Sequence, residues 1–130
     1  MKIINNSLGF CELTFYEHYV ISVVHEGVNL TTELSLKITA VILDFYNGKP
    51  FTYITHRKHS YSLDPLIYNN TSKVDNLLAF AVVTHNYYNE QNTEVERLFL
   101  KKPYMVFPTL LGAKNWATIV FKKHLLKTTT

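Results

Sequence analysis

The sequence predicts a single α/β domain, covering residues 1–130, with a mixed five-stranded sheet flanked by about four helices. Two observations carry this prediction. Strand-like stretches alternate with helix-like stretches along most of the chain, a pattern typical of a largely parallel sheet. The first two strand-like stretches instead follow each other across a short turn, so an antiparallel hairpin should form one edge of the sheet.

The opening hairpin is predicted by alternation of side chains. From Phe10 to Tyr16 apolar and polar residues alternate, and the stretch from Tyr19 to His25 follows after only two residues. Next, Thr31 or Thr32 is a suitable N-cap for a helix. The apolar residues of that helix recur with a period near 3.6, and Gly48 and Pro50 should end it; they are Leu34, Ile38, Val41, Ile42 and Phe45.

The second half of the chain continues the alternation of strands and helices. Strands are expected at 51–57, 77–84 and 104–107, and the middle one is almost wholly apolar, as for a strand buried on both faces. Asp64 should cap a short helix that has Pro65 at its first position. Thr93 with Glu96 resembles a capping box for the next helix. Thr109 should cap the last helix, whose core-facing residues are Ala113, Trp116, Ala117, Val120 and Phe121.

Composition limits the class of protein. The chain is 47% hydrophobic and 18% charged, and it has one cysteine, which fits a reducing compartment. It has no apolar run long enough for a signal peptide or a membrane span, so we expect a cytoplasmic protein. The four glycines are isolated, without a phosphate-binding loop or dinucleotide fingerprint, which argues against a nucleotide-dependent enzyme.

The charges are distributed unevenly along the chain. Residues 1–96 hold all ten acidic side chains and six Lys or Arg, whereas residues 97–130 hold seven Lys or Arg and no acid. Such an asymmetry can mark a surface for an anionic partner. It is also what a solvated face with a cationic helix end would give. The lysines are too widely spread for a nucleic-acid or membrane surface to be expected.

Several short segments resemble one known family. They are His25-Glu26-Gly27-Val28, Pro50-Phe51, Arg57 with Ser60-Tyr61-Ser62, and Ala79-Phe80-Ala81-Val82-Val83. Together with the element order, they resemble the STAS or SpoIIAA-like family over most of residues 8–125, nearest to small uncharacterised SpoIIAA-like proteins of Bacteroidetes-type bacteria. The resemblance implies that fold and the role of a regulatory, protein-binding module.

The candidate interaction site is the segment that follows the 51–57 strand. Its cations could hold an anion beside a helix start, and its tyrosine could anchor a partner; the residues are Arg57, Lys58, His59, Ser60, Tyr61 and Ser62. In the family, this loop carries an Asp-x-Ser-Gly phosphoacceptor. Here Ser60 and Ser62 lie in the equivalent place without that Asp or Gly. A purely structural loop with solvated cations remains the alternative.

Tyr87 and Tyr88 follow the apolar strand and should reach the same edge of the sheet. They could serve either as partner anchors or as packing at the rim of the sheet. Cys11 shares a strand face with Leu13 and Phe15, so we expect a buried thiol. The six histidines form no recognisable ligand pattern, and a metal site needs three or four convergent ligands. We therefore expect no metal, no cofactor and no catalytic residue.

The leading functional hypothesis is a non-enzymatic protein-interaction or regulatory module of the STAS type, with an unidentified protein partner. The alternative is a carrier of a small anionic or lipid ligand, because related lipid-transfer folds enclose such a pocket. A small enzyme of unknown reaction is the third. A homodimer is left open.

Overall fold

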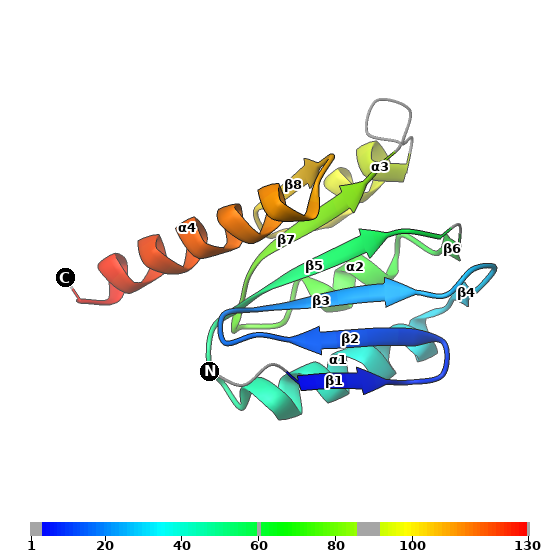
Figure 1. The fold of residues 1–130 in the computed structure, drawn as a ribbon, viewed down its shortest axis with the longest axis horizontal. Coiled ribbons are helices and arrows are strands. Elements are labelled where there is room, and N and C mark those ends of the chain that lie inside the picture. Colours follow the sequence, from blue (N-terminus) through cyan, green and yellow to red (C-terminus); the bar gives the residue numbers. More distant parts are fainter. Residues whose placement is uncertain (1–3, 60, 86–91, 130) are drawn as a thin grey trace.

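The centre of the fold is a mixed six-stranded sheet, seen in a computed structural model that describes residues 4–59, 61–85 and 92–129 (Figure 1). The strand order is β1-β2-β3-β5-β7-β8. The strands are β1 (Ile4–Ser7), β2 (Cys11–Phe15), β3 (Tyr19–Val24), β5 (Phe51–Arg57), β7 (Leu77–Thr84) and β8 (Tyr104–Phe107). The prediction of a mixed sheet is confirmed, and the bounds of β5, β7 and β8 are those expected.

The sheet has one strand more than the sequence predicted. The expected hairpin of β2 and β3 is present, but β1 pairs antiparallel with β2 and forms the outer edge. All four residues of β1 are exposed, so the strand carries no alternation of apolar and polar side chains. It is held by its ladder with β2, which a hydrophobic pattern does not reveal. From β3 onward every pair, β3–β5, β5–β7 and β7–β8, is parallel.

In the described part of the chain, four helices cover the two faces of the sheet, as the sequence predicted. α1 (Thr32–Tyr46) and α2 (Ile67–Thr71) lie behind the sheet in Figure 1, and α4 (Leu110–Thr129) crosses in front of it. α3 (Asn92–Phe99) ends beside Leu100, which is buried in the same core cluster as α1 and α2. A separate two-stranded ladder joins β4 (Asn29–Leu30) to β6 (Ser62–Leu63).

The caps explain where the long helices begin and end. The Thr31 hydroxyl accepts a hydrogen bond from the Leu34 backbone N–H at 3.2 Å, and the Thr109 hydroxyl accepts one from Gly112 at 3.1 Å. Both N-caps were expected. At the end of α1 the left-handed cap residue is Asn47, with φ of 48°, rather than Gly48. Asparagine tolerates this conformation better than most residues do, and Gly48 continues it with φ of 87°.

The short helix α2 begins later than the sequence predicted. It starts at Ile67, and the Asp64 carboxylate accepts a hydrogen bond from the Leu66 backbone N–H at 3.0 Å. Asp64 therefore stabilises the turn that precedes the helix and does not cap the helix itself. Pro65 lies in that turn and not at the first helical position.

The two faces of the sheet are packed in different ways. Between the sheet and α4 the buried cluster combines Ile54 and Val83 with three alanines, Ala81, Ala113 and Ala117, that are at 0% exposure. The face covered by α1 and α2 is filled mainly by large side chains, which include Phe15, Tyr46, Phe51, Tyr68 and Phe80. In the described part of the chain no helix is both long and apolar enough to cross a membrane.

Candidate functional site

Strand β5 directs every second side chain toward α1 and α2. Phe51, Tyr53 and Thr55 line a pocket on that face, and Arg57 comes next in the same alternation. Ile54, between them, packs instead in the core under α4. The strand therefore supplies both the floor of a pocket and a buried cation at its end.

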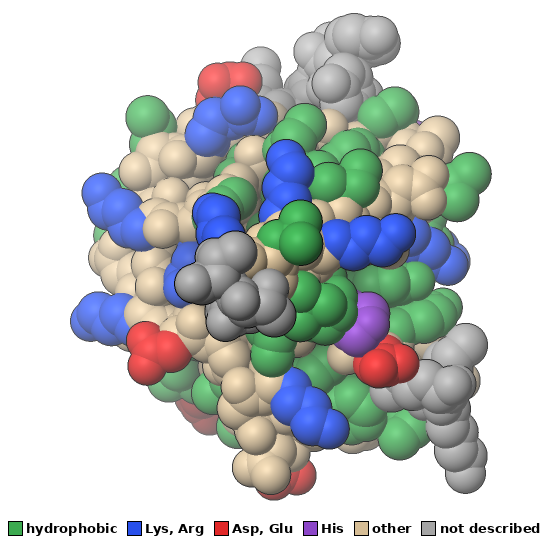
Figure 2. Space-filling view, turned by 90° about the vertical axis from the view of Figure 1, so that its left-hand side faces the viewer, with side chains coloured by type: hydrophobic (Ala, Val, Ile, Leu, Met, Phe, Trp, Pro, Cys, Tyr) green, Lys and Arg blue, Asp and Glu red, His purple; other side chains and the backbone are tan. Residues whose placement is uncertain are grey.

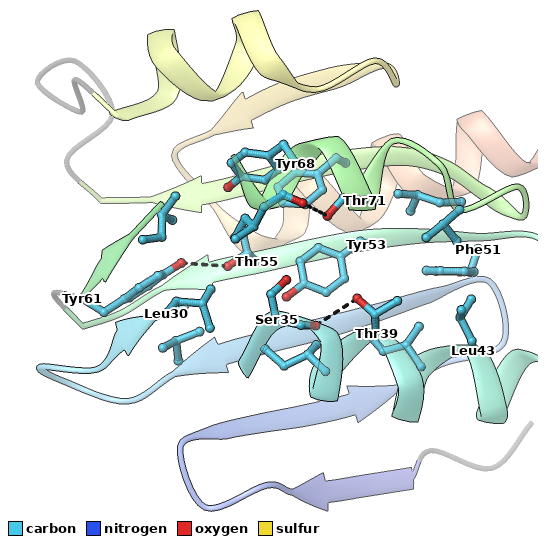
Figure 3. Close-up of a pocket in the computed structure, with 18 residues that line it drawn as sticks. Leu30, Ser35, Thr39, Leu43, Phe51, Tyr53, Thr55, Tyr61, Tyr68 and Thr71 are labelled. Atoms are coloured by element: carbon cyan, nitrogen blue, oxygen red, sulfur yellow. Dashed lines mark hydrogen bonds between the residues drawn. The ribbon is translucent and has the colours of Figure 1, made fainter. Parts of the chain in front are cut away.

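The pocket lies between α1, α2 and the sheet and has a volume of about 60 Å³. Figure 3 shows Tyr61 at one end of the pocket, Phe51 near the other, and the ring of Tyr53 between them. The half-buried side chains of Ser35 and Thr39 on α1 and of Thr71 on α2 also line it. The remaining lining residues are Val24, Leu30, Ile38, Ile42, Leu43, Thr55, Leu63, Ile67, Tyr68, Val74, Leu77 and Phe80.

The lining of the pocket is apolar apart from hydroxyl groups. None of the described residues that line it carries a charge. The Thr39 hydroxyl donates to the Ser35 carbonyl at 3.0 Å, and the Thr71 hydroxyl donates to the Ile67 carbonyl at 3.3 Å. Both oxygens keep a lone pair with which they could accept a hydrogen bond. Burial raises the pKa of Tyr53 above its usual range, so its hydroxyl stays neutral.

A buried ion pair borders the pocket at its Tyr61 end. The Arg57 guanidinium donates to the Glu96 carboxylate, and these side chains are 6% and 1% exposed. The Tyr68 hydroxyl donates to the same carboxylate oxygen, and the Tyr104 hydroxyl lies 3.4 Å from the other. Arg57 Nε also donates to the Tyr61 hydroxyl at 3.4 Å. The cluster joins β5, α2, α3 and β8.

The cluster keeps its tyrosines neutral and its arginine charged. Burial and the facing Glu96 raise the pKa of both Tyr68 and Tyr104. Burial acts to lower the pKa of Arg57, but Tyr61 and Glu96 raise it above its usual value. Because a buried charge needs a partner of opposite sign, the pair holds α3 against the sheet.

Two expectations from the sequence are therefore wrong. Arg57 was expected on the exposed surface of the loop, but alternation along β5 turns its side chain inward. Glu96 was expected to complete a capping box with Thr93, but α3 begins at Asn92 and the Glu96 carboxylate faces Arg57. A buried arginine requires a carboxylate partner, and that requirement outweighs the local capping pattern.

The exposed part of the predicted interaction site is smaller than expected. Lys58 and His59 are exposed, and His59 Nδ1 lies 3.8 Å from the Glu26 carboxylate. Ser62 is exposed in β6, and its hydroxyl donates to the Asn29 side chain at 2.9 Å. β6 separates these cations from α2, so they do not flank a helix start. Tyr61 is half-buried against the pocket. Ser60, Tyr87 and Tyr88 lie outside the described residues.

Cys11 is fully buried, as expected. Its sulfur lies 3.4 Å from the Ser22 hydroxyl, and burial raises the pKa of the thiol, which therefore stays protonated at neutral pH. Such a thiol is a poor nucleophile. The described residues contain no group of three or more His, Cys, Asp or Glu that could hold a metal ion.

The basic end of the chain faces away from the 57–62 loop. Figure 2 looks onto the edge of the molecule where the parallel strands begin and α4 ends, and Lys or Arg side chains are scattered there among apolar and neutral ones. Lys101, Lys122, Lys123 and Lys127 are exposed. The charges form no continuous patch on this face, which fits the solvated alternative.

A pocket was expected only by analogy with lipid-transfer folds, and its lining residues were not predicted because no sequence motif indicates a cavity. A usable signal was present in α1, where Ser35 and Thr39 are spaced i, i+4 beside the apolar residues Ile38 and Ile42. Hydroxyl side chains on the face of a helix that packs on a sheet are unusual unless that face meets a cavity or a partner. Likewise, alternation from Phe51 to Arg57 could have predicted a buried arginine.

A comparison with solved structures identifies the fold. The chain is similar to an uncharacterized protein from the DUF3478 family with a SpoIIAA-like fold, from Shewanella loihica PV-4. The TM-score is 0.53 and the identity 14%, over 89% of this chain and 92% of that one. No family model and no curated protein matches the sequence. The SpoIIAA-like fold is thus supported, and it carries no activity with it.

Proposed function

We propose that this protein is a non-enzymatic protein-interaction or regulatory module of the STAS type, in the group of small SpoIIAA-like proteins of Bacteroidetes-type bacteria. Its partner surface is the exposed part of the 57–62 loop. The observation that carries the proposal is the way this loop is held: the β4–β6 ladder and the hydrogen bond from Ser62 to Asn29 fix it at the carboxyl edge of the parallel strands. Ligands and partners of open α/β sheets commonly bind at that edge.

The chemistry of the surroundings favours binding over catalysis. Arg57, at the end of β5, and Glu96 are buried in contact with each other and present no group to a substrate. Lys58 is exposed and offers positive charge to an acidic partner surface, and the exposed His59 beside it adds a group that can form hydrogen bonds. Pairing of Ser62 and Leu63 in β6 anchors the described end of this segment, which limits the conformational entropy lost on binding.

The test is a charge reversal of the exposed cations, Lys58→Glu with His59→Glu, followed by affinity capture from the native host and quantitative mass spectrometry. Lys49→Glu is the matched control, because Lys49 is exposed just before β5 whereas Lys58 follows it. We expect a partner that is retained by the wild type and the control and lost at least tenfold by the double variant. Equal recovery by all three proteins would refute the proposal.

A second candidate function is carriage of a small anionic or lipid ligand. The pocket between α1, α2 and the sheet is the observation that favours it. At about 60 Å³ it is well below the roughly 300 Å³ of typical drug-sized sites, so a whole lipid does not fit without movement. An anion finds no counter-charge among the described lining residues.

A further inference from the structure

We propose that the pocket between α1, α2 and the sheet binds a compact, uncharged, mostly apolar molecule of about five heavy atoms, a short-chain alcohol being the simplest example. The proposal deepens the second candidate function by naming the class of ligand, and it does not depend on the partner surface at Lys58 and His59.

The described lining of the pocket carries no charged side chain. The described lining residues are aliphatic, aromatic or hydroxyl-bearing. Moving an isolated carboxylate or ammonium group into such surroundings is strongly unfavourable. Arg57 could in principle attract an anion, but its guanidinium is occupied by Glu96 and Tyr61. An uncharged molecule avoids this cost and gains from the removal of its apolar surface from water.

The volume of the pocket limits the size of its ligand. A cavity needs about 10–15 Å³ to hold one water, so a volume of about 60 Å³ is four to six times that minimum. That space suits a molecule of about that many heavy atoms. The walls limit it firmly on the sheet side, where Val24, Phe51 and Leu77 are each at most 3% exposed.

Hydroxyl groups on α1 and α2 form a polar rim of the pocket. The Ser35, Thr39 and Thr71 side chains are half-buried on α1 and α2 (Figure 3). On the sheet side, Val24, Phe51 and Leu77 are apolar and buried. A ligand with an apolar tail and one hydroxyl can place the tail against the sheet and its hydroxyl near these oxygens. Tyr61 closes the end toward the loop, so an occupied pocket contacts the segment that leads into β6.

The test is a titration of the purified protein with butan-1-ol, monitored by amide chemical shifts in NMR. Butanoate and butylammonium are the matched charged probes. We expect saturable shifts centred on α1, α2, β5, residues 61–63 and the lining residues of β3 and β7, with α4 unaffected, and at least tenfold weaker binding of both ions. Equal or tighter binding of butanoate would overturn the proposal, as would shifts that do not saturate or that centre on α4.

Two variants narrow the pocket from different walls. Val24→Ile adds a methylene from β3, and Val74→Leu adds one from the half-buried rim after α2. Each should weaken butan-1-ol binding at least fivefold. Val23→Ile makes the same change on the opposite face of β3 and should bind like the wild type. Two folded pocket variants that bind as tightly as the wild type would contradict the proposed site.

Binding of butan-1-ol in the pocket does not depend on the proposed protein partner. The Lys58→Glu, His59→Glu double variant should bind butan-1-ol as the wild type does, because neither residue lines the pocket. A protein that captures a partner but shows no alcohol binding would refute the pocket proposal alone. Alcohol binding without partner capture would refute the partner proposal alone.

Discussion

The two faces of the sheet differ in the side chains that pack against the covering helices. Under α4, alanines at positions 81, 113 and 117 are fully buried, and their small side chains let the helix come close to the strands. Under α1 and α2, rings such as Tyr46 and Phe80 hold the helices away from the strands. The described pocket lies on this ring-packed face, between α1, α2 and the sheet. We therefore assign a structural role to the face covered by α4 and ligand binding to the face covered by α1 and α2.

The faces also differ in their polar groups. The α1 and α2 face contains the buried pair of Arg57 and Glu96 with its tyrosines, whereas His56 and Thr52 of β5 point to the side of α4. A buried ion pair contributes little net stability, but it is costly to break. The binding face is therefore the more sensitive of the two to loss of a single charge.

The largest effect is expected from Glu96→Ala, which leaves Arg57 buried without its carboxylate. Loss of one partner of a buried ion pair costs about 3–5 kcal/mol, and urea unfolding would measure it. Glu94→Ala is the matched control, because Glu94 is exposed on the same helix and should change stability by no more than about 0.5 kcal/mol. If both variants lose the same stability, the ion pair has no special role.

A smaller effect is expected from overpacking the α4 face. Ala117→Leu should cost about 1–3 kcal/mol, because the new side chain meets a closely packed sheet. Ala40→Leu makes the same change on the exposed side of α1 and should be nearly neutral. On the pocket face, Val24→Ile should also be tolerated, since the cavity accepts its methylene. If Ala117→Leu were tolerated and Val24→Ile were strongly destabilising, the α4 face would be the more loosely packed of the two. That outcome would contradict the contrast between the faces.

The smallest effect concerns pH. Burial, with Lys58 and His85 nearby, lowers the pKa of His56 below its ordinary value of 6.5. The unfolded chain therefore binds a proton at His56 more readily than the folded chain does. Its contribution to stability is present above pH 6.5 and is lost as the pH falls below that value.

His56→Gln should therefore reduce the loss of stability on acidification, and Lys58→Gln should reduce it less. Urea midpoints measured between pH 5 and pH 8 would show both effects. A steeper acid loss in His56→Gln than in the wild type would show that the sign is wrong.

Much of the fold could be predicted from the sequence because periodicity reports burial. The nearly continuous apolar run at 77–84 and the helical period in α1 both follow directly from contact with the core. β1 escaped prediction because its residues Ile4, Asn5, Asn6 and Ser7 are all exposed and its pairing involves the backbone. The hydrophobic pattern does not indicate a strand whose side chains are all exposed.

The candidate site was predicted less completely than the fold. The exposure of Lys58 and His59 agrees with the predicted loop, but Arg57 and Glu96, 39 positions apart in the sequence, meet only in three dimensions. Local patterns favoured a surface cation and a capping residue, and tertiary pairing overrode both. The pocket depends on how side chains and helices pack in three dimensions. The hydrophobic pattern of the sequence does not report this packing.

The most direct test of the contrast between the two faces is a crystal structure of the protein under xenon pressure. Xenon enters apolar cavities that are large enough to hold it. We predict xenon density between α1, α2 and β5, beside Tyr53 and Val24, and none between α4 and the sheet. A pocket without xenon, or xenon bound under α4 instead, would contradict the assignment of binding to the α1 and α2 face.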